Sequence, residues 1–145
     1  MLEERVKTAL VGNLEVQLNQ LRDSQNSDES VDLARQLSQL AIETNKRYRI
    51  FTKKLHSEGL IDFNDMNFLD HNYTGIIGSL IGDTEAFIEG VYGLDRYIPK
   101  AIGSIQQIKL MRLPIIFQKL KEIVGSNGIQ YKQILGNFIE ILETD

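Results

Sequence analysis

The two histidines of this sequence are its clearest candidates for catalytic chemistry, and the first follows a cation at helical spacing. His56 lies seven residues after Arg49 in the stretch NKRYRIFTKKLH. On a helix this spacing places both side chains on one face, about 10 Å apart along the axis. The alternative is that His56 sits at a solvated helix end, where a positive charge interacts favourably with the helix dipole.

The segment RIFTKKLH resembles the Arg–x(4–6)–His motif of HEPN ribonucleases, which are small all-α proteins that dimerise. The resemblance implies that Arg49 and His56 are catalytic and that the site is completed across a dimer. It covers only this short segment, and Ile50 stands where the family usually has a polar residue after the arginine.

His71 follows Asp70 in a region where the sequence predicts the start of a helix. A phosphotransfer histidine needs an exposed position in the middle of a helix, with a base or an amide nearby. The place beside Asp70 favours a histidine in the cap region instead. His71 with Asp65, Asp70 or His56 also lacks the Glu–His pairing of di-iron bundles. The sequence therefore predicts no metal site and no cofactor.

The segment DHNYTGIIGSLI, from Asp70 to Ile81, opens like the calcium loop of an EF-hand. Such a loop requires a bidentate glutamate at position twelve, where this chain has Ile81. A phosphate-binding loop is also excluded, because no strand is predicted before the glycines and no GK[ST] sequence follows them. The simpler interpretation is a helix that is capped by Asp70 or Asn72.

Small residues recur at helical spacing from this point on. They form one narrow face, which we call the small face: Gly75, Ser79, Gly82, Ala86, Gly90 and Gly93. Each glycine inside a helix costs about 0.5–1 kcal/mol relative to alanine, so several of them need a reason. Close packing of another helix of the same chain is the favoured explanation. A symmetry-related copy of the helix and a bound ligand are the alternatives.

Charge is divided into blocks along the chain. The segment 55–95 has no lysine or arginine but contains Glu58, Asp62, Asp65, Asp70, Asp83, Glu85, Glu89 and Asp95. The segment 96–121 has no acid but contains Arg96, Lys100, Lys109, Arg112, Lys119 and Lys121. We expect the acidic helix to lie between basic neighbours, in surface pairs worth about 0–1 kcal/mol each. The alternative is a basic face for an anionic partner, either nucleic acid or a membrane surface.

The elements that position these residues are predicted to be helices of a single domain, residues 1–145. Helices are expected at 2–21, from the polar loop 23–30 to Gly59, at 73–98, from Pro99 to the GSNG sequence at 125–128, and at the C-terminus. The second of these has a continuous apolar seam: Ala34, Leu37, Ala41, Thr44, Tyr48, Phe51 and Leu55. The connector 60–72 is expected to place four residues in the core: Ile61, Phe63, Met66 and Phe68. Pro114 is predicted to break or kink the fourth helix.

Composition excludes several classes of protein. The chain has no cysteine, so disulfides and thiolate chemistry are absent. It shows no secretory signal and no apolar run of about 18 residues, so we expect a cytoplasmic protein without a membrane span. The net charge of −4 argues against a general nucleic-acid binder, although it does not exclude regional binding.

The sequence therefore predicts an all-α bundle of four to six helices, with the small-faced helix near its centre. We interpret it as a non-enzymatic interaction module, which would be a regulator, an adaptor or an assembly subunit. Its partner is another protein or a second copy of itself, bound through a helix face. The alternatives are a HEPN-like ribonuclease that uses Arg49 and His56, and a small-ligand sensor built around the glycine-rich helix 73–98.

Overall fold

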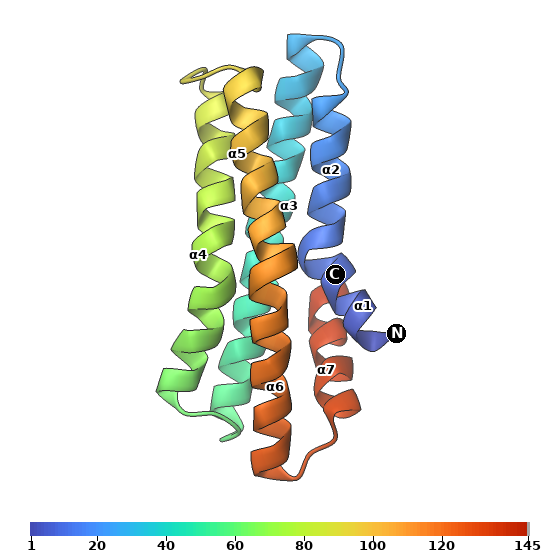
Figure 1. Cartoon of the computed structure of the whole chain (residues 1–145), viewed down its shortest axis with the longest axis vertical. Helices are drawn as coiled ribbons and strands as arrows, with labels where there is room; N and C mark the ends of the chain where they lie inside the picture. The colour runs from blue at the N-terminus through green and yellow to red at the C-terminus, as the bar shows by residue number, and fades with distance from the viewer. Residues whose placement is uncertain (145) are drawn as a thin grey trace.

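The computed structural model of the protein describes residues 1–144, which form helices and no strand (Figure 1). The predicted all-α bundle is confirmed. Its elements are α1 (Leu2–Lys7), the π-helical segment η1 (Thr8–Gly12), α2 (Asn13–Arg22), α3 (Ser27–Ser57), α4 (Phe63–Ile88), α5 (Leu94–Gln107), the π-helical segment η2 (Ile108–Arg112), α6 (Leu113–Asn127) and α7 (Tyr131–Glu143). Within these residues no helix is both long and apolar enough to cross a membrane.

The bundle consists of four columns, and three of them are single long runs of helix. These are α3, α4 and the continuous run α5–η2–α6 (Figure 1). The fourth column is built from two pieces. α2 packs against α3 and α5 in one half, and α7 packs against α3 and α6 in the other half. α1 leaves the line of α2 and packs across α7, so both ends of the chain meet in this column.

Capping side chains and left-handed glycines set several helix ends. α3 begins at Ser27, because the Asn26 side chain accepts a hydrogen bond from the amide of Glu29 at 2.7 Å. The predicted polar loop 23–30 was therefore too long. α3 ends just before Gly59, and α6 ends just before Gly128. Both glycines have positive φ, at +76° and +67°, as a helix stop requires.

The predicted connector 60–72 is wrong, because α4 already begins at Phe63. The Asp62 side chain caps this helix by accepting a hydrogen bond from the amide of Asp65 at 2.8 Å. A capping aspartate is the sequence signal that would have placed the start correctly. The helix is consequently almost three turns longer at this end than predicted.

The expected core residues of that segment divide into two pairs. Ile61 is buried and Met66 packs against the core, as predicted. Phe63 and Phe68 lie on the surface instead, with 60% and 42% of their area exposed. Both phenylalanines belong to α4, and its helical turn directs them away from the core.

The predicted helix 73–98 is wrong at its C-terminal end too, because α4 ends at Ile88. Gly90 has a φ of +79°, and the amides of Gly90 and Val91 donate back to carbonyls of the last turn. This arrangement is a Schellman motif, which stops a helix with a left-handed glycine. Gly90 and Gly93 therefore lie in the turn that follows α4.

Pro99 does not act as predicted, because it lies inside α5, which begins at Leu94, and so it does not start a helix. Pro114, the second residue of α6, does not end the helical run, but α-helical pairing gives way to the π turn of η2 just before it. In η2 the amide of Leu113 donates to the carbonyl of Ile108, five residues earlier. This wide turn relieves the clash that a proline ring makes with the preceding turn of an α-helix.

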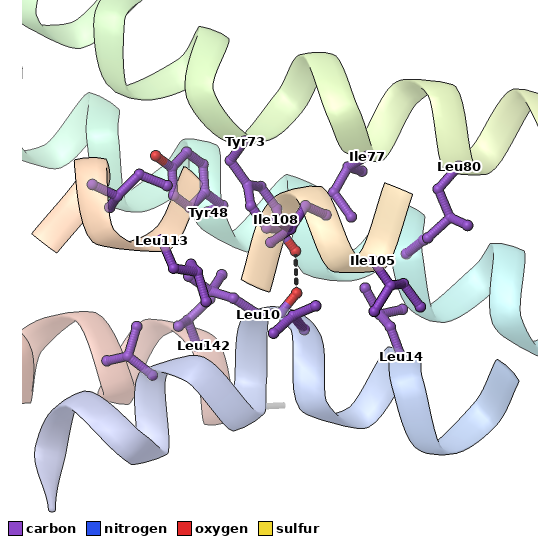
Figure 2. Packing of buried hydrophobic residues seen from close by; sticks show 14 of the residues in the cluster. Leu10, Leu14, Tyr48, Tyr73, Ile77, Leu80, Ile105, Ile108, Leu113 and Leu142 are labelled. Atoms are coloured by element: carbon purple, nitrogen blue, oxygen red, sulfur yellow. Dashed lines mark hydrogen bonds between the residues drawn. The ribbon is translucent and has the colours of Figure 1, made fainter. Parts of the chain in front are cut away.

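The core confirms the predicted seam of α3, whose seven residues are all buried. Three tyrosines are fully buried as well, and each hydroxyl has a partner. Tyr73 donates to the carbonyl of Leu10 in η1 at 2.6 Å (Figure 2), and Tyr97 shares a 2.6 Å hydrogen bond with Thr84. Burial raises the pKa of Tyr48 and Tyr73, and it raises the pKa of Tyr97 to about 12. All three are therefore neutral and serve as structural groups.

Candidate functional site

An exposed apolar surface lies where α4 runs beside η2 and α6. We call it the α4–α6 surface, and it consists of Phe68, Leu110, Met111, Pro114 and Ile115. Its four large side chains are 42%, 66%, 58% and 40% exposed in the order Phe68, Leu110, Met111, Ile115. Together they present on the order of 400 Å² of apolar area, which matches the largest patches of ordinary monomers, and such patches are often functional.

The run IKLMRLPIIF, residues 108–117, contains both buried and exposed apolar side chains. Four of them face inward and are buried: Ile108, Leu113, Ile116 and Phe117. The remaining apolar residues of the run point outward. The wide turn of η2 changes the angle between successive side chains. The buried and exposed residues of this run therefore do not alternate with the regular period of an α-helix.

The α4–α6 surface contains a hollow and a ridge. The hollow has a volume of about 440 Å³ and is lined by Phe68, Pro114, Ile115, Gln118, Lys119 and Glu122. Leu110 and Met111 lie about one turn before Pro114 and Ile115 on the same column, so they form a ridge beside the hollow. The apolar centre is thus bordered by polar groups on the α6 side.

The one cation at the edge of the hollow is compensated within the chain. The ammonium group of Lys119 lies 2.7 Å from the Asp65 carboxylate and 3.8 Å from that of Glu122. It also lies 5.4 Å from the centre of the Phe68 ring. The hydrogen bond to Asp65 raises the pKa of Lys119, so the group stays charged.

A buried amide joins η2 to α4 beneath this surface. The Asn72 side chain accepts a hydrogen bond from Nη1 of Arg112 at 3.0 Å and donates to the carbonyl of Phe68 at 2.8 Å. Nε of Arg112 is buried and has no partner among residues 1–144. The predicted cap role of Asn72 is wrong, because Asn72 lies inside α4 and positions the groups that frame the hollow.

Within residues 1–144 the glycines and the serine of the small face that lie on α4 do not pack against another helix, so this explanation of the face is wrong. Gly75, Ser79 and Gly82 are exposed on α4, and Ala86 is half-buried. A Cβ atom added at Gly75 or Gly82 would meet no atom of the rest of the molecule within 4 Å. Contact with a second copy or with a ligand stays a prediction.

Arg49 and His56 are both exposed on α3. The His56 ring lies edge-on to Phe63, with 6.3 Å between the ring centres. The structure holds no partner chain that could complete a site, so the ribonuclease interpretation stays a prediction.

His71 is the ninth residue of α4 and is exposed. Its predicted place in a cap region is therefore wrong, because α4 begins almost three turns earlier than expected. Asn67 lies one turn before His71 on the same helix and is also exposed. His71 thus lies exposed inside a helix, on the same side as the amide side chain of Asn67.

The acidic and basic blocks pair with each other at one place within residues 1–144, through Asp65 and Lys119. Other cations of the basic segment pair with the N-terminal helices instead. Lys109 lies 3.1 Å from Glu15, and Lys121 lies 3.8 Å from Glu3. The expected pairing of the acidic helix with its basic neighbours is therefore limited to a single contact.

A second hollow of about 470 Å³ lies between α3 and α7, where Lys46, Ile50 and Lys54 face Glu140 and Ile141. Arg47 crosses this region and donates to the Leu142 and Thr144 carbonyls, so its role is to hold the end of α7. Polar and charged side chains make up most of this lining. It therefore lacks the continuous apolar area of the α4–α6 surface.

Comparison of this chain with protein-family models, with curated proteins and with solved structures finds no match. Within residues 1–144 no group of three histidine, aspartate or glutamate side chains is placed to hold a metal ion. The α4–α6 surface is a feature of residues 1–144 that packing within the chain does not explain, because four large apolar side chains remain exposed there.

Proposed function

We propose that this protein is a non-enzymatic interaction module that binds another polypeptide through the α4–α6 surface. The observation that supports this proposal is the exposure of four large apolar side chains on two packed segments, two of which, Phe68 and Ile115, line a hollow. Apolar area that leaves water contributes about 25 cal/mol per Å². The exposed parts of these side chains give the isolated chain none of that stabilisation, whereas a complex with a partner that covers them would gain it.

The arrangement has the anatomy of a protein interface. Phe68, Met111 and Ile115 would form the apolar centre, where most of the binding energy of an interface is concentrated. Gln118 and Glu122 would form the polar rim. Roles as a regulator, an adaptor or an assembly subunit are all compatible with such a surface.

A photo-cross-linking amino acid at position 111 tests the proposal in cells that express the protein. We expect one discrete cross-linked polypeptide, because a specific partner covers the ridge. The same amino acid at position 42 is the matched control, since Ile42 is 48% exposed but lies on α3. We also expect Leu110→Asp in the same chain to abolish the product, because it places a charge in the apolar centre.

Equal and diffuse cross-linking from positions 111 and 42 would contradict the proposal. So would a discrete product that persists in the Leu110→Asp chain with unchanged yield. Circular dichroism should show that Leu110→Asp keeps its helices, because the substituted side chain is 66% exposed.

A second function is supported by the position of His71, which we infer to be a candidate phosphoryl acceptor. Its imidazole is exposed in the middle of α4, in a bundle of four columns. An imidazole nitrogen could attack a phosphoryl donor without rearrangement of the fold. In phosphoramidate the P–N bond would break, ammonia would leave, and a new P–N bond to the imidazole would form.

Incubation with phosphoramidate tests this function directly. We expect an acid-labile gain of one phosphoryl group that peptide mass spectrometry places on His71 and that His71→Ala abolishes. His56 serves as the internal control, because it is also exposed but lies at the end of α3. Equal labelling of both histidines would show only that exposed imidazoles react with phosphoramidate. It would contradict a dedicated role for His71.

A further inference from the structure

We propose that the polypeptide that covers the α4–α6 surface is a second copy of this chain, in a twofold dimer. This inference rests on the function proposed above and names the partner. It follows from three properties of the surface, which are its shape, its charge and its size.

The shape is self-complementary, because the surface carries both a ridge and a hollow. A twofold axis places the same patch of both copies face to face, so each projection must meet a depression of the same surface. An axis that passes near Pro114 makes the two η2–α6 columns antiparallel. Met111 and Leu110 of each copy then lie over the hollow that is lined by Phe68, Pro114 and Ile115 in the other copy.

The charges of the surface permit two identical copies to meet. Lys119 is already paired with Asp65 and Glu122, so this cation is compensated within each copy. Arg112, near the proposed axis, donates a hydrogen bond to the Asn72 side chain of its own copy. Glu122 lies eight residues from Pro114, which is about 12 Å from the proposed axis along a helix. The two copies of Glu122 are then separated by more than the Debye length of about 8 Å at physiological salt.

The size of the patch fits the centre of a stable interface. Standard interfaces bury about 800 Å² per partner, of which the apolar centre is only a part. A patch on the order of 400 Å² supplies that centre. Rim residues from α4 and α6 supply the remaining contact area.

Sedimentation equilibrium of the purified chain tests the inference. We expect a dimer whose dissociation constant rises about 30-fold or more in Met111→Asp, because a charge in the interface centre removes a major contact. Ile42→Asp is the matched control, since it makes the same chemical change at an exposed apolar residue of α3 and should leave the constant unaltered.

A single cysteine locates the interface independently, because the chain has no cysteine of its own. Pro114→Cys lies next to the proposed axis, and we expect it to form a disulfide-linked dimer under mild oxidation. Ile42→Cys should remain largely monomeric under denaturing, non-reducing conditions.

Two outcomes would overturn the inference. A chain that stays monomeric at about 1 mM excludes self-association through this surface. A dimer that is unaffected by Met111→Asp and uncross-linked by Pro114→Cys places the contact elsewhere. The photo-cross-linking experiment separates this failure from failure of the proposed function. A discrete product that contains a different polypeptide removes the homodimer and retains the interaction surface.

Discussion

Phe138→Ala is expected to lower the free energy of unfolding by about 3–5 kcal/mol, the usual range for deletion of a fully buried phenylalanine ring. Phe138 is completely buried. Its ring stacks on Phe51 with 3.9 Å between the ring centres and an angle of 4°, and it lies 5.9 Å from the ring of Tyr48. This aromatic group attaches α7 to α3.

The loss is expected to be concentrated in the lower half of the fourth column. α7 is a short helix, and short helices depend on packing for their stability. Without the ring of Phe138, α7 loses its main anchor and α1 loses the helix that it covers. Partial undocking should therefore accompany the loss of stability.

Urea denaturation followed by circular dichroism measures this effect. Phe63→Ala is the matched control, because it removes the same ring from a position that is 60% exposed, and it should change stability by no more than about 0.5 kcal/mol. A similar loss in both variants, or less than about 1 kcal/mol for Phe138→Ala, would show that the stack does not hold α7.

The triple substitution Gly75→Ala, Gly78→Ala and Gly82→Ala is expected to stabilise the protein by about 2–3 kcal/mol. These glycines lie inside α4, where alanine is favoured by about 0.8–1 kcal/mol per residue. A methyl group at each position would meet no atom of the rest of the molecule within 4 Å. The gain should therefore be close to the intrinsic difference between the two residues.

Gly90→Ala and Gly128→Ala are the matched controls, because these glycines have φ values of +79° and +67°. The same methyl group is strained there, so we expect a loss of about 1–2 kcal/mol for each. Thermal unfolding of all five single variants separates the two classes. Destabilisation by Gly75→Ala and Gly82→Ala, but not by Gly78→Ala, would show that the small face is covered in solution, and would favour the predicted copy or ligand at that face.

The helical class and the inner faces of the longest helices were predictable from the sequence. The seam of α3 repeats at intervals of four and three residues, and every member of it is buried. A helix that buries one side must carry apolar residues at the helical period along that side. The buried side can therefore be identified from residues that are close together in the sequence.

Helix ends were predictable only where their signal was recognised. Gly59 and Gly128 were expected to stop helices, and they do. Asp62 and Gly90 carry equally local signals, and the wrong start and end of α4 followed from not applying them. The continuation of helix through Pro114 has a different origin. The π turn before Pro114 accommodates the ring, and no residue pattern in the sequence announces that turn.

The candidate site was not predicted from the sequence, for a physical reason. Phe68 was expected in the core, and the outward residues of the run LMRLPII were not singled out. An apolar residue looks the same in the sequence whether it is buried or exposed. Which face of a helix is left uncovered depends on how many other helices surround it and on how each helix is rotated about its own axis.

By itself, the sequence determined a helical protein without cysteine, the buried stripes of its helices and the glycines that end several of them, because these depend on residue type and on contacts a few residues apart. Only the tertiary structure decided that α2 and α7 share one column, that the small face meets no helix of its own chain and that Phe68, Met111 and Ile115 remain in water. These features depend on contacts between segments far apart in the chain. No local pattern of residues specifies which segments those are.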